Sequence, residues 1–428
     1  MINVKKVKFA VVGLILTGSV ALLAGSSNAA SKSKLIASSQ PGWPQWRGPR
    51  REGVSDETGL LKAWPAGGPK VLWTAGGLGK GFSSPVLGQD AIYITGDVGS
   101  ELHIFALTLD GKPKWKSVNG KAWAKPFGGA RGSCTYDDGR VFSYNAYGRL
   151  ACFEAKDGKE IWAVDTAKKY GAAKIYFGMS ESPLIDGDGV IVTTGGKKAR
   201  VVRLDKKTGK ELWATKPKPQ EAATYCSSIL AELGGKRQII TCGSRHAFGI
   251  DARNGKIIWA FRHQIEKSAS AAIPVLHGDL LYISNSSREK GLSYCLKIDT
   301  RAGKAVKVWD SNFSIFHGSA IGVNGKIFGA SRKNVKGWGR LDFASGKTDY
   351  LLDDLAVGSS IYADGLLYCL AQSGQMALLK PTDKGFEIAG RFTLAEKKKD
   401  AWAHPVILDG KLYLRYGPNL YCYDIKKK

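Results

Sequence analysis

Residues 204–213 read Leu-Asp-Lys-Lys-Thr-Gly-Lys-Glu-Leu-Trp, and this phrase decides the fold because it recurs along the chain. A second full copy, Ile-Asp-Ala-Arg-Asn-Gly-Lys-Ile-Ile-Trp, occupies residues 250–259. Each copy contains an acid, a Gly-Lys pair and, after two further residues, an aromatic residue. The closing aromatic residues recur about every 46 residues, which is a period typical of repeat architectures. They are Trp73, Trp115, Trp162, Trp213, Trp259, Trp309 and Tyr350.

The length of the repeat selects the architecture. About 46 residues suit one four-stranded blade of a β-propeller. Short apolar runs separated by Asp-Gly and Asn-Gly pairs, such as Asp138-Gly139 and Asn324-Gly325, predict tight hairpins. The 53 glycines follow no three-residue period, so they favour turns over a collagen-like chain. We therefore predict an all-β fold, an eight-bladed β-propeller of four-stranded antiparallel blades within residues 69–428.

The two ends of the repeat array complement each other. The last unit stops after residues 421–425 without an outer strand of its own, whereas Val71-Leu72-Trp73 has the pattern of an outer strand without a blade. Pairing the two would remove two open sheet edges. We predict that this N-terminal strand completes the eighth blade and closes the ring.

The repeated phrase also has a mechanical meaning. Aspartate caps the turn through its side chain, and glycine adopts a positive backbone φ. The tryptophan ends the outer strand, where a large flat ring can fill the wedge between neighbouring blades. We therefore assign a structural, blade-docking role to Trp73, Trp115, Trp162, Trp213, Trp259, Trp309 and Tyr350.

The N-terminus has the pattern of a secretory signal peptide. Lys5, Lys6 and Lys8 precede an apolar run over residues 9–23, which small and polar residues follow. The run is about 15 residues long, shorter than the ~20 that a membrane span needs. We predict a signal peptide over residues 1–29, no transmembrane segment in the mature chain, and a periplasmic or secreted location.

A leader segment, residues 30–68, is predicted between the signal peptide and the propeller. It contains Trp43 and Trp46 in a proline-bounded stretch. Because large aromatic rings anchor segments by packing, we expect both to dock on the outside or underside of the ring as a strap.

The charge balance is strongly basic. The chain has 63 Lys and Arg against 37 Asp and Glu, a formal net charge of +26. Such a balance favours anionic partners, and a lysine-rich solvated surface is the alternative explanation. The chain has no named nucleic-acid-binding motif, so we expect no nucleic-acid partner.

The sequence gives little support for a metal site or for a catalytic nucleophile. The six histidines lack zinc spacing. Near the inner-strand openings the only acids are Glu181 and Glu221, whereas a hard cation needs several converging oxygens. Seven cysteines cannot all pair internally, and a disulfide between Cys226 and Cys242 stays open. We predict no metal site and assign no catalytic residue.

The axial face of the ring is the predicted ligand site. The loops entering each inner strand, and those joining the second and third strands, should share one face. Basic residues of these loops, Arg332 and Lys333 among them, surround an aromatic centre, which suits an anionic or sugar-like ligand. The predicted ligand-binding residues are Phe82, Arg131, Glu181, Tyr225, Arg245, His317, Trp402 and His404.

The phrase at residues 205–213, Asp-x-x-Thr-Gly-Lys-x-x-Trp, resembles the tryptophan-docking motif of the PQQ-like (pyrroloquinoline quinone) repeat superfamily. The likeness covers roughly residues 69–428. That superfamily includes quinoprotein alcohol dehydrogenases, polyvinyl-alcohol dehydrogenase and the propeller of the outer-membrane protein assembly machinery. Residues 43–49, Trp-Pro-Gln-Trp-Arg-Gly-Pro, look like the lead-in of exported bacterial members.

The resemblance implies two functions. Its dehydrogenases hold PQQ on the axis with calcium or a lanthanide, a catalytic Asp and, typically, a disulfide between adjacent cysteines. This sequence has neither adjacent cysteines nor a Cys-x-x-Cys-His haem site. We therefore expect an exported non-catalytic binding or scaffold propeller without a cofactor, whose partners are envelope proteins, an anionic glycan or a small anion. The alternative is a PQQ-dependent alcohol or sugar oxidoreductase that binds PQQ with calcium.

Overall fold

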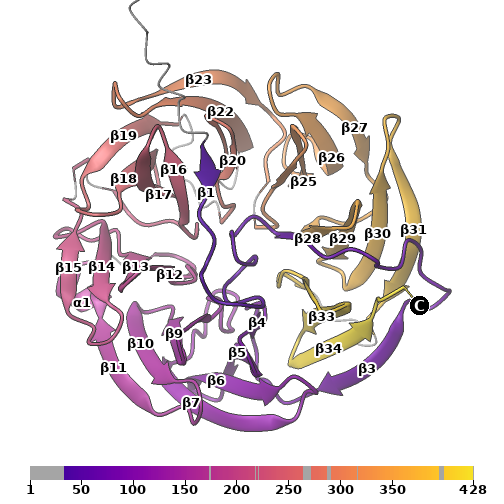
Figure 1. Ribbon diagram of the computed structural model, residues 1–428, viewed down its shortest axis with the longest axis horizontal. Coiled ribbons are helices and arrows are strands. Elements are labelled where there is room, and N and C mark those ends of the chain that lie inside the picture. The colour runs from indigo at the N-terminus through magenta and orange to yellow at the C-terminus, as the bar shows by residue number, and fades with distance from the viewer. Residues whose placement is uncertain are drawn as a thin grey trace, which may run out of the picture. The chain divides into compact units, whose positions relative to one another are not determined.

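The computed structural model describes residues 33–172, 175–216, 218–219, 221–263, 271–286, 291–315, 317–394 and 400–427. The predicted signal peptide, residues 1–29, lies outside the described residues. The unit Ser31–Lys428 forms a ring of β-sheets (Figure 1).

Eight sheets make up the ring, and each is one blade. In every blade the strands are antiparallel, with the first strand toward the centre and the last at the outside (Figure 1). Blades one to four consist of β4 (Val86–Leu87), β5 (Ala91–Val98), β6 (Glu101–Thr108) and β7 (Pro113–Lys121); β8 (Thr135–Asp137), β9 (Arg140–Tyr144), β10 (Arg149–Glu154) and β11 (Glu160–Asp165); β12 (Leu184–Asp186), β13 (Gly189–Thr193), β14 (Val201–Asp205) and β15 (Glu211–Ala214); and β16 (Ile229–Leu233), β17 (Lys236–Cys242), β18 (His246–Asp251) and β19 (Ile257–Arg262).

The second half of the ring has the same organisation. Blades five to eight consist of β20 (Val275–His277), β21 (Leu280–Ser286), β22 (Gly291–Asp299) and β23 (Lys304–Ser311); β24 (Ile321–Val323), β25 (Lys326–Arg332), β26 (Lys336–Asp342) and β27 (Thr348–Leu352); β28 (Gly358–Ala363), β29 (Leu366–Ala371), β30 (Gln375–Pro381) and β31 (Phe386–Thr393); and β32 (Val406–Leu408), β33 (Lys411–Tyr416), β34 (Asn419–Asp424) and β3 (Lys70–Ala75). A short helix, α1 (Thr166–Tyr170), joins blades two and three.

The predicted closure of the ring is confirmed. Strand β3 pairs antiparallel with β34, so Trp73 lies opposite Cys422 and the N-terminal strand completes blade eight. An all-β, eight-bladed propeller closed in this way leaves no blade without its outer strand, which protects both ends of the array.

The repeated tryptophans join neighbouring blades. The indole Nε1 of Trp115 donates to the carbonyl oxygen of Ala155 in the next blade, at 2.9 Å. The ring of Trp115 covers Gly158, whose φ is +75° and where a Cβ would come within 2.5 Å of the indole. The same contacts recur from Trp162 to Lys206 and Gly209, from Trp213 to Ala252 and Gly255, and from Trp309 to Phe343 and Gly346, while Trp73 covers Gly111.

Trp259 reaches its neighbour differently. Its indole lies against Gly249 of its own blade, and Nε1 donates to Oε1 of Gln238 at 2.9 Å. The Gln238 amide then donates to the hydroxyl of Thr300 in blade five at 3.0 Å. Gln238 therefore links Trp259 to blade five.

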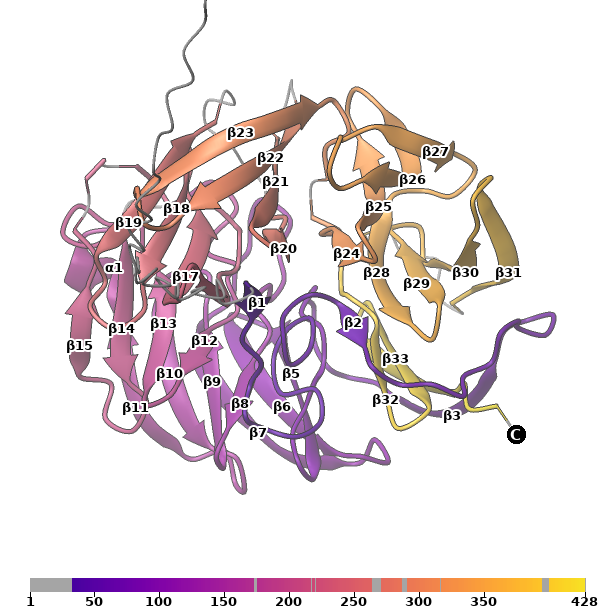
Figure 2. The ribbon, with the colours of Figure 1, turned by 45° about the horizontal axis from the view of Figure 1, so that its top comes forward.

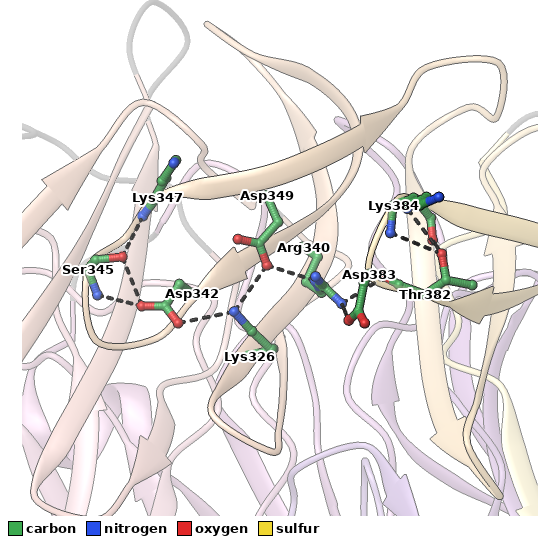
Figure 3. A network of polar contacts seen from close by, with 10 residues as sticks. Lys326, Arg340, Asp342, Ser345, Lys347, Asp349, Thr382, Asp383 and Lys384 are labelled. Carbon is green, nitrogen blue, oxygen red and sulfur yellow. Dashed lines mark hydrogen bonds and ion pairs between the residues drawn. The ribbon is translucent and has the colours of Figure 1, made fainter.

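An arginine supports the junction where tyrosine replaces tryptophan. The guanidinium carbon of Arg340 lies 4.6 Å from the centroid of the Tyr350 ring, and Nη1 donates to the carbonyl oxygen of Thr382 at 2.8 Å. Asp349 accepts from Arg340 Nε at 2.7 Å and pairs with Lys326 at 3.1 Å (Figure 3). Arg340 thus makes the bond to the next blade that an indole makes elsewhere.

The leader crosses the centre of the ring (Figures 1 and 2). Its strand β1 (Lys34–Leu35) adds to the inner strand β16, and β2 (Val54–Ser55) adds in parallel to the inner strand β28. Between them, Trp43 is buried and pairs with Leu87, at the end of the inner strand of blade one.

Two leader arginines, Arg47 and Arg51, extend among the inner strands. The Arg51 guanidinium donates to the carbonyl oxygens of Ser182 at 2.9 Å, of Ser228 at 2.7 Å and of Pro183. Arg47 donates to the carbonyl oxygen of Ala320 at 2.6 Å. Because guanidinium presents several donors in one plane, each arginine connects the leader with strands that enter the ring far apart in the sequence.

Candidate functional site

A cavity of about 310 Å³ lies on the axial face, where the inner strands begin. Its described lining includes six aromatic residues, namely Trp46, Phe82, Phe127, Phe177, Tyr225 and Trp402. The remainder are polar, basic or small, namely Arg131, Ser180, Ser182, Ser227, Ala271, His317, Arg332, Lys333 and His404. This volume is at the lower end of the range of ~300–1,000 Å³ for small-molecule pockets.

The structure brings together most of the predicted ligand-binding residues. The cavity is lined by Phe82, Arg131, Tyr225, His317, Trp402 and His404.

Glu181 and Arg245 do not line the cavity. Glu181 is buried inside the blade, where its carboxylate accepts hydrogen bonds from the backbone N–H of Thr193 and from the hydroxyl of Ser228 at 2.9 Å. Arg245 lies in the loop between β17 and β18, and its backbone N–H donates to Glu221. Hydrogen bonds hold Glu181 to Thr193 of its own blade and to Ser228 of blade four, and they hold Arg245 to Glu221; sequence position could not show this.

The aromatic side chains form a continuous arc around the mouth. Ring centroids are 4.5 Å apart for Phe82 and Trp402, 5.5 Å for Trp402 and Phe127, 5.9 Å for Phe127 and Phe177, and 5.4 Å for Phe177 and Tyr225. The arc, defined by these five residues, comes from the loops of blade eight and blades one to four. It offers flat apolar faces to a ligand.

Arg131 organises the loop that presents Phe127. The φ of Phe127 is +52°, a left-handed conformation that bulky residues rarely adopt. The Arg131 guanidinium donates to the carbonyl oxygens of Gly129 at 2.6 Å, of Pro126 at 2.9 Å and of Phe127. Burial lowers the pKa of Arg131 to about 10. Arg131 therefore acts mainly as a positioning residue for the aromatic arc.

Asp97 supports the same loop from below and gives it a pH dependence. Its Oδ2 accepts a hydrogen bond from the backbone N–H of Trp123 at 3.1 Å. Burial raises the pKa of Asp97 to about 6, against the opposing effect of that hydrogen bond and of the Arg131 charge. The folded protein therefore binds this proton more tightly than the unfolded chain does.

Asp97→Asn is expected to remove that part of the pH dependence. The parent gains stability from Asp97 as pH falls through about 6 toward about 4, because protonation then relieves the cost of burying the charge. Melting temperatures of both proteins at pH 7 and pH 5 test this. We expect the difference between parent and variant to shift in favour of the parent at pH 5, and an unchanged difference would contradict the assignment.

The two histidines of the cavity are neutral near pH 7. Burial lowers the pKa of His317 to about 4, and the charge of Arg332 adds to the effect. Burial and the charge of Arg47 lower the pKa of His404. Nη1 of Arg47 lies 3.2 Å from Nδ1 of His404, and since guanidinium only donates, Nδ1 accepts. Trp46 packs edge-on against His404 at 5.0 Å.

A chain of serines fixes the inner wall. In each bond a serine hydroxyl oxygen accepts from a backbone N–H of the preceding blade. Ser84 accepts from His404 at 2.8 Å, and Ser133 accepts from Ser84 at 2.9 Å. Ser182 accepts from Ser133 and Ser227 accepts from Ser182, both at 3.0 Å. Each serine thus ties one blade to the next. Serine recurs in the sequence just before the first strand of blades one to four, and this recurrence could have indicated the arrangement.

The cavity has an aromatic side and a basic side. Arg332 and Lys333 come from blade six, across the ring from the middle of the aromatic arc. None of the described lining residues is Asp or Glu. The described chain also holds no group of three or more His, Cys, Asp and Glu residues that could bind a metal ion. The described lining therefore combines flat aromatic side chains with basic side chains.

Sequence reasoning placed Trp46 wrongly and did not find Phe127 and Phe177. Trp43 does pack at the inner strand of blade one, but Trp46 lines the cavity instead of lying on the outside of the ring. The leader turns inward because Arg47 and Arg51 bind inner-strand carbonyls. Phe127 and Phe177 lie in loops whose paths depend on contacts between blades.

Two further predictions have structural outcomes. Cys226 and Cys242 are both buried, free thiols, like the other five cysteines. Among the described residues, no helix is long and apolar enough to cross a membrane.

Comparisons with known proteins identify relatives with two activities. The family model described as "Outer membrane protein assembly factor BamB" matches residues 100–349. Outer membrane protein assembly factor BamB of Shewanella oneidensis is 22% identical over 277 residues, which cover 64% of this chain and 65% of the relative. Quinohemoprotein alcohol dehydrogenase ADH IIB of Pseudomonas putida is 25% identical over 207 residues, which cover 45% of this chain and 28% of the relative. The matches thus span less than two thirds of either relative.

A solved structure has the same fold. Quinohemoprotein alcohol dehydrogenase from Comamonas testosteroni superposes with a TM-score of 0.67 at 12% identity, over 92% of this chain and 82% of that chain. At this identity the likeness shows the fold alone.

Proposed function

This chain belongs to the family of outer membrane protein assembly factor BamB, and on that premise we propose that it is a non-catalytic binding propeller of the bacterial cell envelope. The axial cavity is its recognition site, and an anionic ligand or envelope protein is its partner. The observation that carries the proposal is the described lining, which combines an aromatic arc with Arg332 and Lys333 and contains no carboxylate.

The lining supports binding better than proton transfer. General acid–base catalysis works best when a pKa lies near the working pH. The pKa of His317 is lowered to about 4, so its imidazole is a weak base and donates no proton near neutrality. Nδ1 of His404 is occupied by Arg47. Neither histidine is therefore suited to the role of general acid.

The donor set does not fit PQQ with calcium. Calcium takes six to eight oxygen ligands, usually with several carboxylates among them. The predicted acid Glu181 lies outside the described lining and already accepts hydrogen bonds from Thr193 and Ser228. Oxidoreduction through a calcium-bound quinone is therefore the alternative that the following experiment must exclude.

The test is calorimetric titration of the mature protein with PQQ, with and without calcium, together with an artificial-acceptor assay on alcohols and sugars. We expect no calcium-dependent saturable binding and no reduction of the acceptor. Saturable binding that supports acceptor reduction would overturn the proposal in favour of the dehydrogenase.

Deletion of the gene should lower the amount of β-barrel proteins in the outer membrane if the scaffold acts in assembly, and unchanged amounts would contradict that role.

A further inference from the structure

Two of the seven cysteines lie in the same hydrophobic cluster. Cys226 and Cys242 are 2% and 3% exposed, and both pack in the cluster between blades four and five. The other five are buried in five different clusters, namely Cys134, Cys152, Cys295, Cys369 and Cys422. All seven are free thiols. Within the described chain, Cys226 and Cys242 are therefore the pair of thiols that the fold places in one cluster.

The backbone brings the two cysteines together through a bulge. The segment that enters β16 runs antiparallel to the end of β17, where Ala223 pairs with Gly243 and Ile229 pairs with Ile240. Between these two pairings, five residues of the entering segment lie opposite two residues of β17. The surplus residues form a bulge, and bulges change the direction in which side chains point.

Thr224 connects the backbones of the two cysteines. Its hydroxyl donates to the carbonyl oxygen of Cys242 at 2.7 Å and accepts from the backbone N–H of Cys226 at 3.4 Å. Disulfides join Cα atoms roughly 4.4–6.8 Å apart, and facing residues of antiparallel strands have Cα atoms about 4.5–5.5 Å apart. Two cysteines on adjoining strands, linked through one threonine, therefore lie within the reach of a disulfide.

The thiols are themselves in contact. The Cys226 thiol shares a hydrogen bond with Cys242, and this bond, together with burial, raises the pKa of Cys226. The Cys226 thiol also donates to the carbonyl oxygen of Ser227 at 3.3 Å. The two sulfur atoms are therefore held beside each other in the reduced protein.

The bulge also forms part of the cavity wall. Tyr225 and Ser227, which flank Cys226, line the cavity, whereas Cys226 packs in the hydrophobic cluster. The Tyr225 hydroxyl accepts a hydrogen bond from the backbone N–H of Phe177 at 3.2 Å. A covalent bond from Cys226 to β17 would therefore fix the part of the wall that carries Tyr225 and Ser227.

We propose that Cys226 and Cys242 are joined by a structural disulfide in the mature protein, formed by exchange with a disulfide-bearing oxidant while the chain folds. The disulfide fastens the bulge to β17. This inference goes beyond the proposed function, because it concerns a covalent modification and no ligand.

The exchange proceeds in two balanced steps. One thiolate of the pair attacks a sulfur of the oxidant, so that a mixed disulfide forms and a first thiol leaves. The other thiolate of the pair then attacks the protein sulfur of the mixed disulfide and displaces the second thiol. The pair loses two electrons and two protons, and the oxidant takes up both as two thiols.

Burial decides when the bond forms. Thiolate is the reactive form, and it is scarce when a buried thiol has a raised pKa. Exchange is therefore fast only before the blade has packed, and packing then protects the bond from reductants. The predicted signal peptide would carry the folding chain to an oxidising compartment, where disulfides form and persist.

Thiol counting in the mature protein tests the proposal. One sample is incubated with dithiothreitol and another with glutathione disulfide, both in urea just below the unfolding midpoint, where buried groups exchange through transient opening. Each is then denatured, alkylated and measured by mass spectrometry. We expect seven alkylated cysteines after dithiothreitol. After glutathione disulfide we expect about two fewer, no glutathione adduct, and a linked peptide that contains Cys226 and Cys242.

The bond should also raise thermal stability. It closes a loop of about 15 residues, which restricts the unfolded chain. After removal of urea, we expect the oxidised protein to melt roughly 3 °C above the reduced protein.

Matched variants identify the two sulfur atoms. Cys226→Ala and Cys242→Ala should each abolish the protein disulfide and the gain in melting temperature. Cys295→Ala removes an equally buried thiol from a different cluster, and should keep both the disulfide and the gain.

Three outcomes would overturn the inference. They are seven alkylated cysteines after both treatments, a glutathione adduct on Cys226 or Cys242 of the parent in place of their bond, and a disulfide that maps to any other pair. None of these outcomes involves a ligand of the cavity, so failure of this inference is distinct from failure of the proposed function.

Discussion

The Arg51→Met variant is expected to unfold much more readily than the parent, with a loss of about 3–5 kcal/mol in unfolding free energy. The Arg51 guanidinium is buried and donates to the carbonyl oxygens of Ser182, Pro183 and Ser228 in blades three and four. Methionine fills a similar volume but has no donor, so these three buried carbonyl oxygens and the buried Oε1 of Gln45 lose a charged partner at once.

The same substitution removes a cation beside Glu181. Burial raises the pKa of Glu181, and the charge of Arg51 opposes that increase. Without Arg51 the pKa of Glu181 rises further in the folded state. Because the cost of a buried carboxylate is relieved when it takes up a proton, the loss of stability should be largest at alkaline pH and smaller in acid.

Urea unfolding followed by tryptophan fluorescence at pH 5, 7 and 9 measures both effects. Arg50→Met is the matched control, since Arg50 pairs with Asp56 at the surface at 2.8 Å and such pairs contribute at most about 1 kcal/mol. Arg51→Lys keeps the charge with fewer donors and should be intermediate. Equal losses for Arg50→Met and Arg51→Met would show that the leader arginine does not hold the inner strands.

Gly346→Ala is expected to lower the unfolding free energy by about 3 kcal/mol, which is more than an ordinary glycine substitution in a turn does. Gly346 has φ +70°, and a Cβ there would lie 2.5 Å from ring carbons of Trp309. The indole cannot retreat easily, because its Nε1 donates to the carbonyl oxygen of Phe343 at 3.0 Å. The added methyl group therefore opposes the docking of blade five on blade six.

Gly139→Ala separates the steric effect from the backbone effect. Gly139 has the same φ of +70°, but a Cβ there meets nothing within 4 Å. Only the left-handed backbone conformation then lowers the unfolding free energy, by about 1 kcal/mol. Urea unfolding of both variants gives the comparison, and equal losses would mean that contact with Trp309 contributes nothing to the requirement for glycine.

The candidate site was partly accessible from the sequence. Phe82, Trp402 and His404 could be placed on the axial face because their position in the repeat puts them at the start of an inner strand. Glu181 occupies a comparable position, yet its carboxylate accepts hydrogen bonds from Thr193 of its own blade and from Ser228 of the next blade. Repeat position fixes the face on which a loop lies, but hydrogen bonding decides where each side chain points.

The sequence by itself determined the ring, because its causes are local and periodic. A capped turn, a glycine with positive φ and a closing aromatic residue recur along the array, and Trp115, Trp162, Trp213 and Trp309 dock on the next blade in the same way. The closing strand at residues 71–73 followed from counting the strands of the repeats. The last unit lacks an outer strand, and the N-terminal end of the array has one strand too many, so the two pair.

Only the tertiary structure decided the site. Arg47 meets His404, and Trp46 enters the cavity, because a leader without any repeat crosses the ring and finds inner-strand carbonyls there. The Phe127 loop takes its path from contacts with Arg131 and with neighbouring blades. Such contacts join residues that no period relates, so they exist only once the ring has closed and brought the loops of different blades around one axis.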